Sequence, residues 1–177
     1  MRTRYAIAGF VCVVGALTAP LVLSALASQG QKPAATSEKP PRAKPQLAQG
    51  RYILMVGGCN DCHTPGFAAA YGKTPESDWL TGSTTGYYGP WGTSYPTNLR
   101  LLVNGMSEDA WVKSNRELKT LPPMPWWVMH EIREADLRDM YRLIKSLGPK
   151  GEDAPAALSP EQKPNPPYMA LVPKPAT

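Results

Sequence analysis

The sequence predicts a small all-α domain with long irregular loops and a proline-rich C-terminal tail. Its 177 residues suffice for one modest domain and exclude a multidomain enzyme. The hydrophobic fraction of 42% is ordinary, so a core must form, and two segments carry apolar residues at helical spacing. The 20 prolines and 15 glycines predict that much of the remaining chain consists of turns and extended segments.

Residues 1–27 have the pattern of a secretory signal peptide. Arg2 and Arg4 form a short basic region, a mostly apolar run follows, and Ala25-Leu26-Ala27 is an A-x-A-like cleavage site. The stretch from Ala6 to Leu26 is also long enough to cross a bilayer, so an uncleaved membrane anchor is the alternative. In both cases we expect the rest of the chain to be exported, and Cys12 to leave with a cleaved signal.

The next two segments differ sharply in composition. Residues 28–46 are rich in Pro, Lys and Ser and predict a semi-extended linker. Residues 47–149 are the expected folded domain, which opens with a helix from Leu47 to Gly57. The helix is predicted by one face made of Leu47, Gly50, Leu54 and Gly57 and by the Gly-Gly pair that would end it.

Little regular structure is expected between Thr64 and Leu121. Glycine, serine, threonine and aromatic residues dominate this long segment. The exception is a short helix that begins after Ser107 and runs toward Leu118. Ser107 can cap this helix, and two acidic residues follow in its positive first turn.

The strongest helix signal covers residues 134–147. One apolar stripe there is formed by Leu137, Met140, Tyr141, Ile144 and Leu147, and Gly148-Pro149 stops the helix. The tail, residues 150–177, is too rich in proline for a long helix. We expect it to wrap the surface or to be disordered, with a single turn at residues 159–162.

The chemistry of the chain is concentrated in Cys59-Asn60-Asp61-Cys62-His63. This C-x-x-C-H sequence is the pattern for covalent attachment of haem c. Two thiols three residues apart, Cys59 and Cys62, can add to the two vinyl groups of one porphyrin, and His63 is then held beneath the iron as the proximal ligand. We therefore expect one covalent haem.

Three other interpretations of the two cysteines have less support from the sequence. A thioredoxin-like redox pair would need a βαβ context, which the sequence lacks. A zinc site would need His130, far along the chain from His63 and outside the usual spacing of zinc ligands. A local disulfide without cofactor is disfavoured by the helix that leads into the motif.

A sixth iron ligand decides between electron transfer and small-molecule chemistry. Met124 is the first candidate, because the prolines of Leu121-Pro-Pro-Met-Pro-Trp-Trp127 keep it out of a helix, in a rigid loop. Methionine–histidine ligation is the cytochrome c arrangement and raises the reduction potential. Met129 and His130 are the reserves, and Met140 is expected in the core.

Aromatic residues lie next to Met124 and in the long loop between Thr64 and Leu121. Trp126 and Trp127 are suited either to donate to a haem propionate through the indole N–H or to pack over the porphyrin edge. Packing of the long loop against the haem is expected from Tyr87, Tyr88, Trp91 and Tyr95.

Residues 47–149 resemble a class I cytochrome c, a small all-α haem protein that shuttles electrons in the bacterial periplasm. The resemblance is carried by Gly50-Arg51-Tyr52, Gly58-Cys-Asn-Asp-Cys-His-Thr-Pro65, the loop from Gly89 to Leu99, Met124-Pro125-Trp126 and the helix from Asp136 to Leu147. The Met-Pro-Trp element is similar to the ligand loop of cytochrome domains associated with periplasmic dehydrogenases. The resemblance also implies that the first and last helices cross near a glycine and an aromatic, here Gly50 and Tyr141.

The expected function is single-electron transfer between redox protein partners in the periplasm, without transformation of a substrate. Two alternatives stay open: an open-site or bis-histidine haem protein that acts as gas sensor or peroxidase, and a membrane-tethered cytochrome subunit of a periplasmic dehydrogenase. The net charge of +5 is a mild bias suited to an acidic partner. Nucleic-acid binding is not expected, because no basic stripe is interleaved with aromatics.

Overall fold

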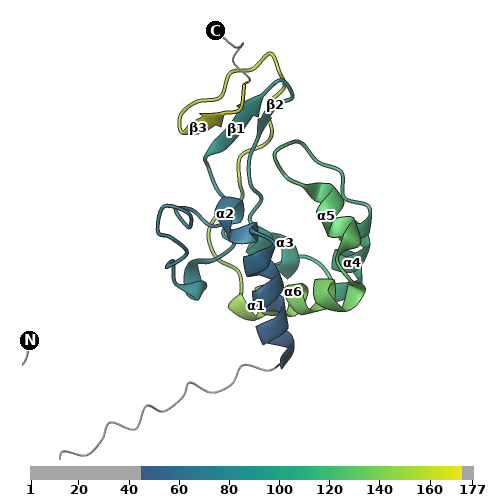
Figure 1. Cartoon of the computed structure of the whole chain (residues 1–177). Coiled ribbons are helices and arrows are strands. Elements are labelled where there is room, and N and C mark those ends of the chain that lie inside the picture. Colours follow the sequence, from purple (N-terminus) through teal and green to yellow (C-terminus); the bar gives the residue numbers. More distant parts are fainter. Residues whose placement is uncertain (1–44, 173–177) are drawn as a thin grey trace, which may run out of the picture. The chain divides into compact units, whose positions relative to one another are not determined.

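Six α-helices and a small three-stranded sheet make up residues 45–172, the part of the chain that the computed structural model describes (Figure 1). The predicted signal peptide and nearly all of the predicted linker lie outside these residues. The elements are α1 (Pro45–Val56), α2 (Cys59–His63), a 3-10 turn (Glu76–Asp78), β1 (Gly86–Gly89), β2 (Gly92–Ser94), α3 (Leu99–Asn104), α4 (Glu108–Arg116), α5 (Trp126–Glu131), α6 (Glu134–Leu147) and β3 (Tyr168–Ala170).

The all-α prediction was right for the helices and wrong for the sheet. The sheet has the order β2-β1-β3. Strands β1 and β2 form an antiparallel hairpin that closes at Gly89 and Gly92, and β3 from the tail pairs in parallel with β1, Met169 opposite Tyr87. The sheet could not be predicted from the local sequence pattern, because its strands have only three or four residues and because β1 and β3 are far apart in the sequence.

Helices α1 and α6 cross with their backbones in direct contact. Leu54 and Gly50 are the buried residues of α1. A Cβ atom at Gly50 would overlap the carbonyl of Asp139, whose carbon would lie 2.7 Å away. The expected crossing at Gly50 is therefore confirmed, but the glycine faces the backbone of Asp139 and Met140. The Tyr141 hydroxyl instead donates to the Met106 carbonyl at 2.8 Å.

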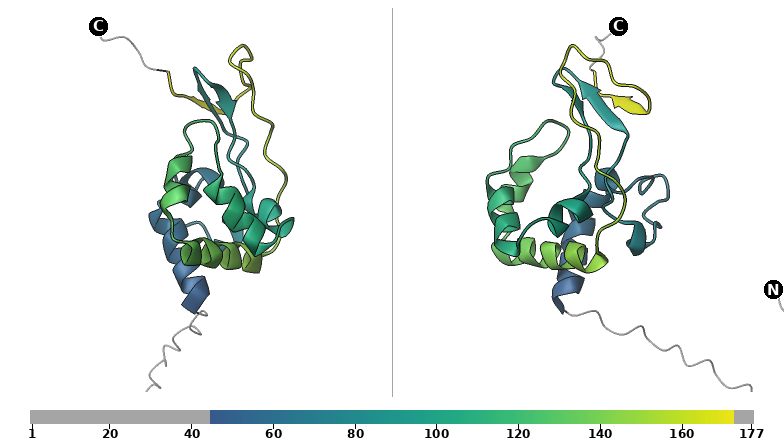
Figure 2. Two further views of the ribbon diagram at one scale, coloured as in Figure 1. Left: turned by 90° about the vertical axis from the view of Figure 1, so that its right-hand side faces the viewer. Right: turned by 180° about the vertical axis from the view of Figure 1, so that it is seen from behind.

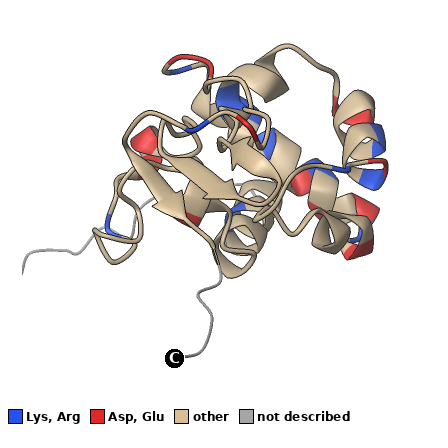
Figure 3. Cartoon of the chain, turned by 90° about the horizontal axis from the view of Figure 1, so that it is seen from above, with Lys and Arg blue, Asp and Glu red and all other residues tan. Residues whose placement is uncertain are grey.

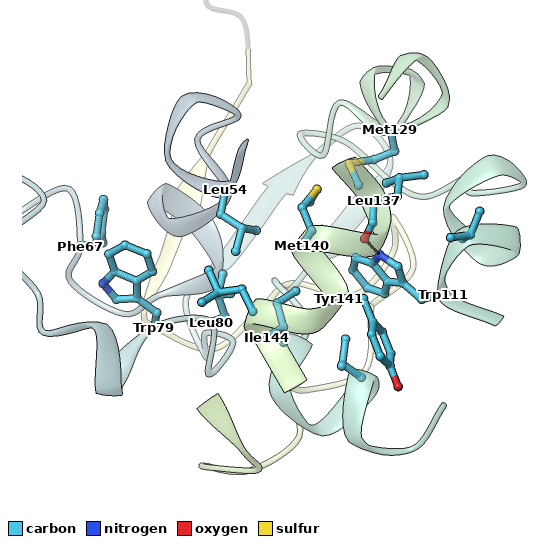
Figure 4. Close-up of a cluster of buried hydrophobic side chains, with 13 residues drawn as sticks. Leu54, Phe67, Trp79, Leu80, Trp111, Met129, Leu137, Met140, Tyr141 and Ile144 are labelled. Atoms are coloured by element: carbon cyan, nitrogen blue, oxygen red, sulfur yellow. Dashed lines mark hydrogen bonds between the residues drawn. The ribbon is translucent and has the colours of Figure 1, made fainter. Parts of the chain in front are cut away.

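The predicted helix over residues 134–147 has the same bounds in the structure as α6, and its apolar stripe lies in the core (Figure 4). Met140 is 1% exposed, as its place in the stripe predicts. The Trp111 indole N–H of α4 donates to the Leu137 carbonyl at 2.9 Å. The buried core is made of Leu54, Phe67, Trp79, Leu80, Val103, Trp111, Val112, Met129, Leu137, Met140, Tyr141, Leu143 and Ile144.

The segment between Thr64 and Leu121 holds more regular structure than expected. The Ser107 hydroxyl accepts from the Ala110 N–H, which confirms the predicted cap of α4. Helix α3 was not predicted. It begins because the Asn98 side chain accepts from two backbone N–H groups in its first turn, an N-cap signal that the sequence carries.

The described part of the C-terminal tail, up to residue 172, wraps the domain. In both views of Figure 2 it runs beside the β1–β2 hairpin. The Asn98 side chain donates to the carbonyls of Lys150 and Glu152, and Thr93 and Leu158 exchange backbone hydrogen bonds. The expected turn at residues 159–162 is present, where the Gln162 N–H donates to the Ser159 carbonyl. The tail thus contributes the third strand of the sheet.

Charged side chains are balanced in the described part of the chain. Residues 45–172 carry 12 Lys and Arg and 13 Asp and Glu, so the positive excess of the whole sequence lies outside them. The ribbons of β1, β2 and β3 carry no charged residue (Figure 3). Among the helices of this part, none is long and apolar enough to span a membrane.

We predict that Gly50→Ala destabilises the protein by about 3 kcal/mol, because α1 must move away from the Asp139 carbonyl to make room. Equilibrium urea unfolding measures this loss. Gly105→Ala is the matched control, because a Cβ there meets no atom closer than 3.7 Å. Equal free energies of unfolding for the two variants would contradict a close crossing at Gly50.

Candidate functional site

The C-x-x-C-H motif folds as one short helix, α2, directly after α1. Gly58 precedes it with φ of 65°, a left-handed conformation that glycine adopts without strain and that turns the chain from α1 into α2. Cys59 and Cys62 are three residues apart on this helix, so their side chains lie on neighbouring positions of one face. Both thiols are half-buried and free.

The Cys59 thiol is held in its neutral form. Burial raises its pKa to about 11, and the backbone N–H of Cys59 opposes this only in part. A reactive dithiol needs a lowered thiol pKa, and in thioredoxin-like proteins the helix follows a strand, whereas α2 follows a helix. Cys59 is therefore poorly suited to act as the attacking thiol in disulfide exchange.

His63 is buried at the end of α2, with one ring nitrogen fixed. Its Nδ1 lies 2.7 Å from the Thr97 carbonyl oxygen. A carbonyl can only accept, so Nδ1 carries the hydrogen and Nε2 keeps a free lone pair. Burial lowers the pKa of His63, against the smaller opposing effect of the Thr97 hydrogen bond, so the ring is neutral at pH 7. A neutral imidazole oriented through Nδ1 is the usual state of a histidine that binds metal through Nε2.

A buried chain of hydrogen bonds fixes the end of α2 to the segment that follows. The Thr64 hydroxyl donates to the Asn60 side-chain oxygen at 2.7 Å and accepts from the Leu80 N–H at 2.7 Å. The His63 carbonyl accepts from the Gly82 N–H at 2.9 Å. These bonds leave the histidine little freedom to turn.

The β1–β2 hairpin adds a second set of groups beside the motif. The Tyr87 hydroxyl on β1 donates to the Cys62 sulfur at 3.4 Å. Trp91 and Thr93 on the same hairpin present a buried indole N–H and a buried hydroxyl that find no hydrogen-bond partner among residues 45–172. Buried donors are rarely left without a partner. Thr93 pairs with Tyr88, so its side chain lies on the face of the hairpin opposite that of Tyr87, away from the contact with Cys62.

The candidate sixth ligands lie on the chain from residue 124 to residue 130. Met124 is half-buried and packs against the core, just before α5. Its carbonyl accepts from the Trp126 N–H at 2.9 Å, and the neighbouring Pro122 carbonyl accepts from the Ser94 hydroxyl of β2 at 2.6 Å. The loop of Met124 is thus attached to the same hairpin that contacts Cys62.

The two reserve ligands are engaged elsewhere. Met129 is 6% exposed and lies among the core side chains near Leu137 (Figure 4). The Nε2 atom of His130 lies 2.9 Å from the Leu118 carbonyl oxygen, and its ring is 5.3 Å from that of Trp126. Either residue would have to leave these contacts before it could bind iron.

The tryptophans of this loop form an edge-to-face pair. The rings of Trp126 and Trp127 are 5.7 Å apart, and Trp127 is 57% exposed.

In residues 45–172, no three His, Cys, Asp or Glu side chains gather so that they could hold a metal ion.

Sequence reasoning singled out Cys59, Cys62, His63 and Met124 as candidates and missed the groups that lie against them. The Thr97 carbonyl, the Asn60–Thr64–Leu80 chain and the Tyr87–Cys62 contact carry no motif. Asn60 lies within the motif and Thr64 directly follows it, four residues apart, and this spacing is the one signal that could have indicated their hydrogen bond.

Comparisons with protein-family models, with curated proteins and with solved structures find no match to this chain. Its function is therefore inferred from the residues of the site and their geometry.

We predict that Thr64→Val destabilises the protein by about 2 kcal/mol, because it removes the acceptor of the buried Leu80 N–H while keeping the shape of the side chain. Thr64→Ser keeps the hydroxyl and should recover most of the loss. Thermal and urea unfolding of both variants measure the difference. If valine and serine proved equally stable, the hydroxyl would have no part in fixing α2.

Proposed function

We propose that this protein is a single-electron carrier that holds one covalent haem c, a monohaem cytochrome c of the periplasm. The observation that carries the proposal is the state of His63 within the C-x-x-C-H motif. Its ring is neutral and buried, with Nδ1 bound to the Thr97 carbonyl and Nε2 left free. When bound, the haem iron supplies reversible one-electron exchange between its ferric and ferrous states.

Cys59 and Cys62 would hold the cofactor. Each thiol would add across one vinyl group, forming a sulfur–carbon bond and passing its hydrogen to the neighbouring carbon, with no net oxidation. Their position on one face of α2 lets both sulfurs reach one flat molecule. The raised pKa of Cys59 supports a structural role for this cysteine over a redox role.

His63 would bind the iron through Nε2, with the ring oriented by the Thr97 carbonyl. The buried Trp91 indole N–H on the hairpin is a donor without a partner in the described residues, and it would suit a propionate. A buried porphyrin would also enlarge the core of a domain in which aromatic residues make up only 8% of the chain.

Met124 would complete the ligand set from its rigid loop. This choice is supported by its half-buried position next to the core and by the engagement of Met129 and His130 elsewhere. With His63 and Met124 both bound to the iron, the site would leave no position for a substrate and would be suited to transfer electrons. Export to the periplasm belongs to the same proposal, because covalent haem and the signal sequence in residues 1–27 point to the same compartment.

The double variant Cys59→Ala, Cys62→Ala should carry no covalent haem and should accumulate as unfolded or degraded protein, because the core lacks the porphyrin. Periplasmic expression, followed by intact mass measurement and by haem staining after denaturing electrophoresis, tests this. Cys12→Ala is the control and should keep the haem. A stable, folded double variant would count against a core that depends on haem.

The oxidised protein should show the weak far-red band of a sulfur–iron bond, and Met124→Ala should abolish it and open the iron to carbon monoxide in the reduced form. Met169→Ala, in the exposed strand β3, is the matched control and should keep the band. Visible spectra of oxidised and reduced proteins measure both effects. Haem without the band in the unsubstituted protein would favour His130 or an open iron site, with gas sensing or peroxidase chemistry.

A further inference from the structure

We propose that the C-terminal segment 150–172 contributes to the haem site. Its strand β3 pairs with β1 and holds the Tyr87 hydroxyl in hydrogen-bond contact with the Cys62 sulfur, and this contact raises the reduction potential of the haem. The inference rests on the proposed haem attachment and assigns a role to a tail that the motif does not explain.

The first step is the contact between Tyr87 and Cys62. The hydroxyl donates to the sulfur at 3.4 Å, within the range for a hydrogen bond to sulfur. Burial, followed by the hydrogen bond to Cys62, raises the pKa of Tyr87, so the hydroxyl keeps its proton and acts as a donor at any physiological pH. The Cys62 sulfur is the atom that would join the porphyrin. Tyr87 therefore presents the positive end of its O–H dipole to the edge of the cofactor.

The second step leads from Tyr87 to the tail. Tyr87 and Met169 form the middle residue pair of the parallel ladder between β1 and β3. The Gly86 N–H donates to the Pro167 carbonyl at 3.1 Å, and the Leu171 N–H donates to the Tyr88 carbonyl at 2.8 Å. The backbone on both sides of Tyr87 is thus held by the tail.

The third step is how the tail itself is anchored. Asn98 holds the Lys150 and Glu152 carbonyls, and Leu158 exchanges two backbone hydrogen bonds with Thr93 of β2. A Cβ at Gly92 would overlap the Leu158 carbonyl, so the tail and the hairpin are in close backbone contact there. The tail is therefore fixed at its start and middle before it reaches β1.

The effect on the cofactor follows from charge. Reduction adds one electron to the haem, and a donor dipole aimed at its thioether sulfur stabilises the reduced state more than the oxidised state. Hydrogen bonds near a haem are one of the means by which a protein sets its potential. Loss of the Tyr87 hydroxyl should lower the potential, while the axial ligands and the sulfur–iron band stay unchanged.

The experiment compares Tyr87→Phe with Tyr88→Phe in the full-length, haem-loaded protein by redox titration followed spectroscopically. Tyr88 is the matched control, because it is the next residue of β1, where its ring packs edge-to-face on Tyr168 at 6.0 Å. We expect a downward shift of the potential for Tyr87→Phe that clearly exceeds the shift for Tyr88→Phe. Equal shifts would overturn the role of Tyr87.

The tail is tested by Leu171→Pro, which removes the N–H that donates to Tyr88, with Leu171→Ala as control. Leu171→Pro should lower the potential in the direction of Tyr87→Phe, and should add little when Tyr87 is already phenylalanine. A full additional shift in the double variant would show that the tail acts by another route and would overturn this part. If Leu171→Pro does not fold, a chain ending at Pro167, which keeps the Thr93–Leu158 pairing, takes its place.

The two proposals fail in different ways. Absence of covalent haem from the unsubstituted protein would overturn the proposed function. Haem that is attached and ligated, with a potential indifferent to Tyr87 and to β3, would overturn only the role of the tail.

Discussion

The backbone contact between α1 and α6 at Gly50 is the constraint on which the rest of the structure depends. Only a residue without a side chain lets α1 approach the Asp139 carbonyl so closely. This approach buries Leu54 against Met140 and Ile144 and fixes where α1 ends. Because only Gly57 and Gly58 separate α1 from α2, the crossing also fixes where Cys59, Cys62 and His63 stand relative to the core.

The site around α2 is assembled from neutral groups held by hydrogen bonds. Burial favours the uncharged forms of Cys59 and His63, and the carbonyl of Thr97 selects the ring nitrogen that carries the hydrogen. Residues 79–99 and 120–130, which include the hairpin and the Met124 loop, contain no charged residue, and Asp61 is the one acidic residue of α2. A site of this kind suits an apolar, flat cofactor.

The tail and the hairpin show how irregular segments can be rigid without helices. The tail is held at Asn98, at Thr93 and along β1, three places far from it in the sequence. All three contacts use the backbone of the tail, so the attachment depends little on the identity of the tail side chains. Proline has no backbone N–H to donate. It suits this tail because several of the hydrogen bonds that attach the tail to the domain are accepted by tail carbonyls.

The sequence by itself determined the helices whose periodicity is local, α1 and α6, the Ser107 cap of α4, and the three motif residues Cys59, Cys62 and His63. These depend on spacings of three or four residues, which a linear pattern records. The sheet and the groups that orient His63 and Cys62 were decided by tertiary structure. They join residues that are far apart in the chain, such as Tyr87 to Met169 and His63 to Thr97. Such pairings arise only when the core has already placed both partners, because no local preference of either residue specifies the other.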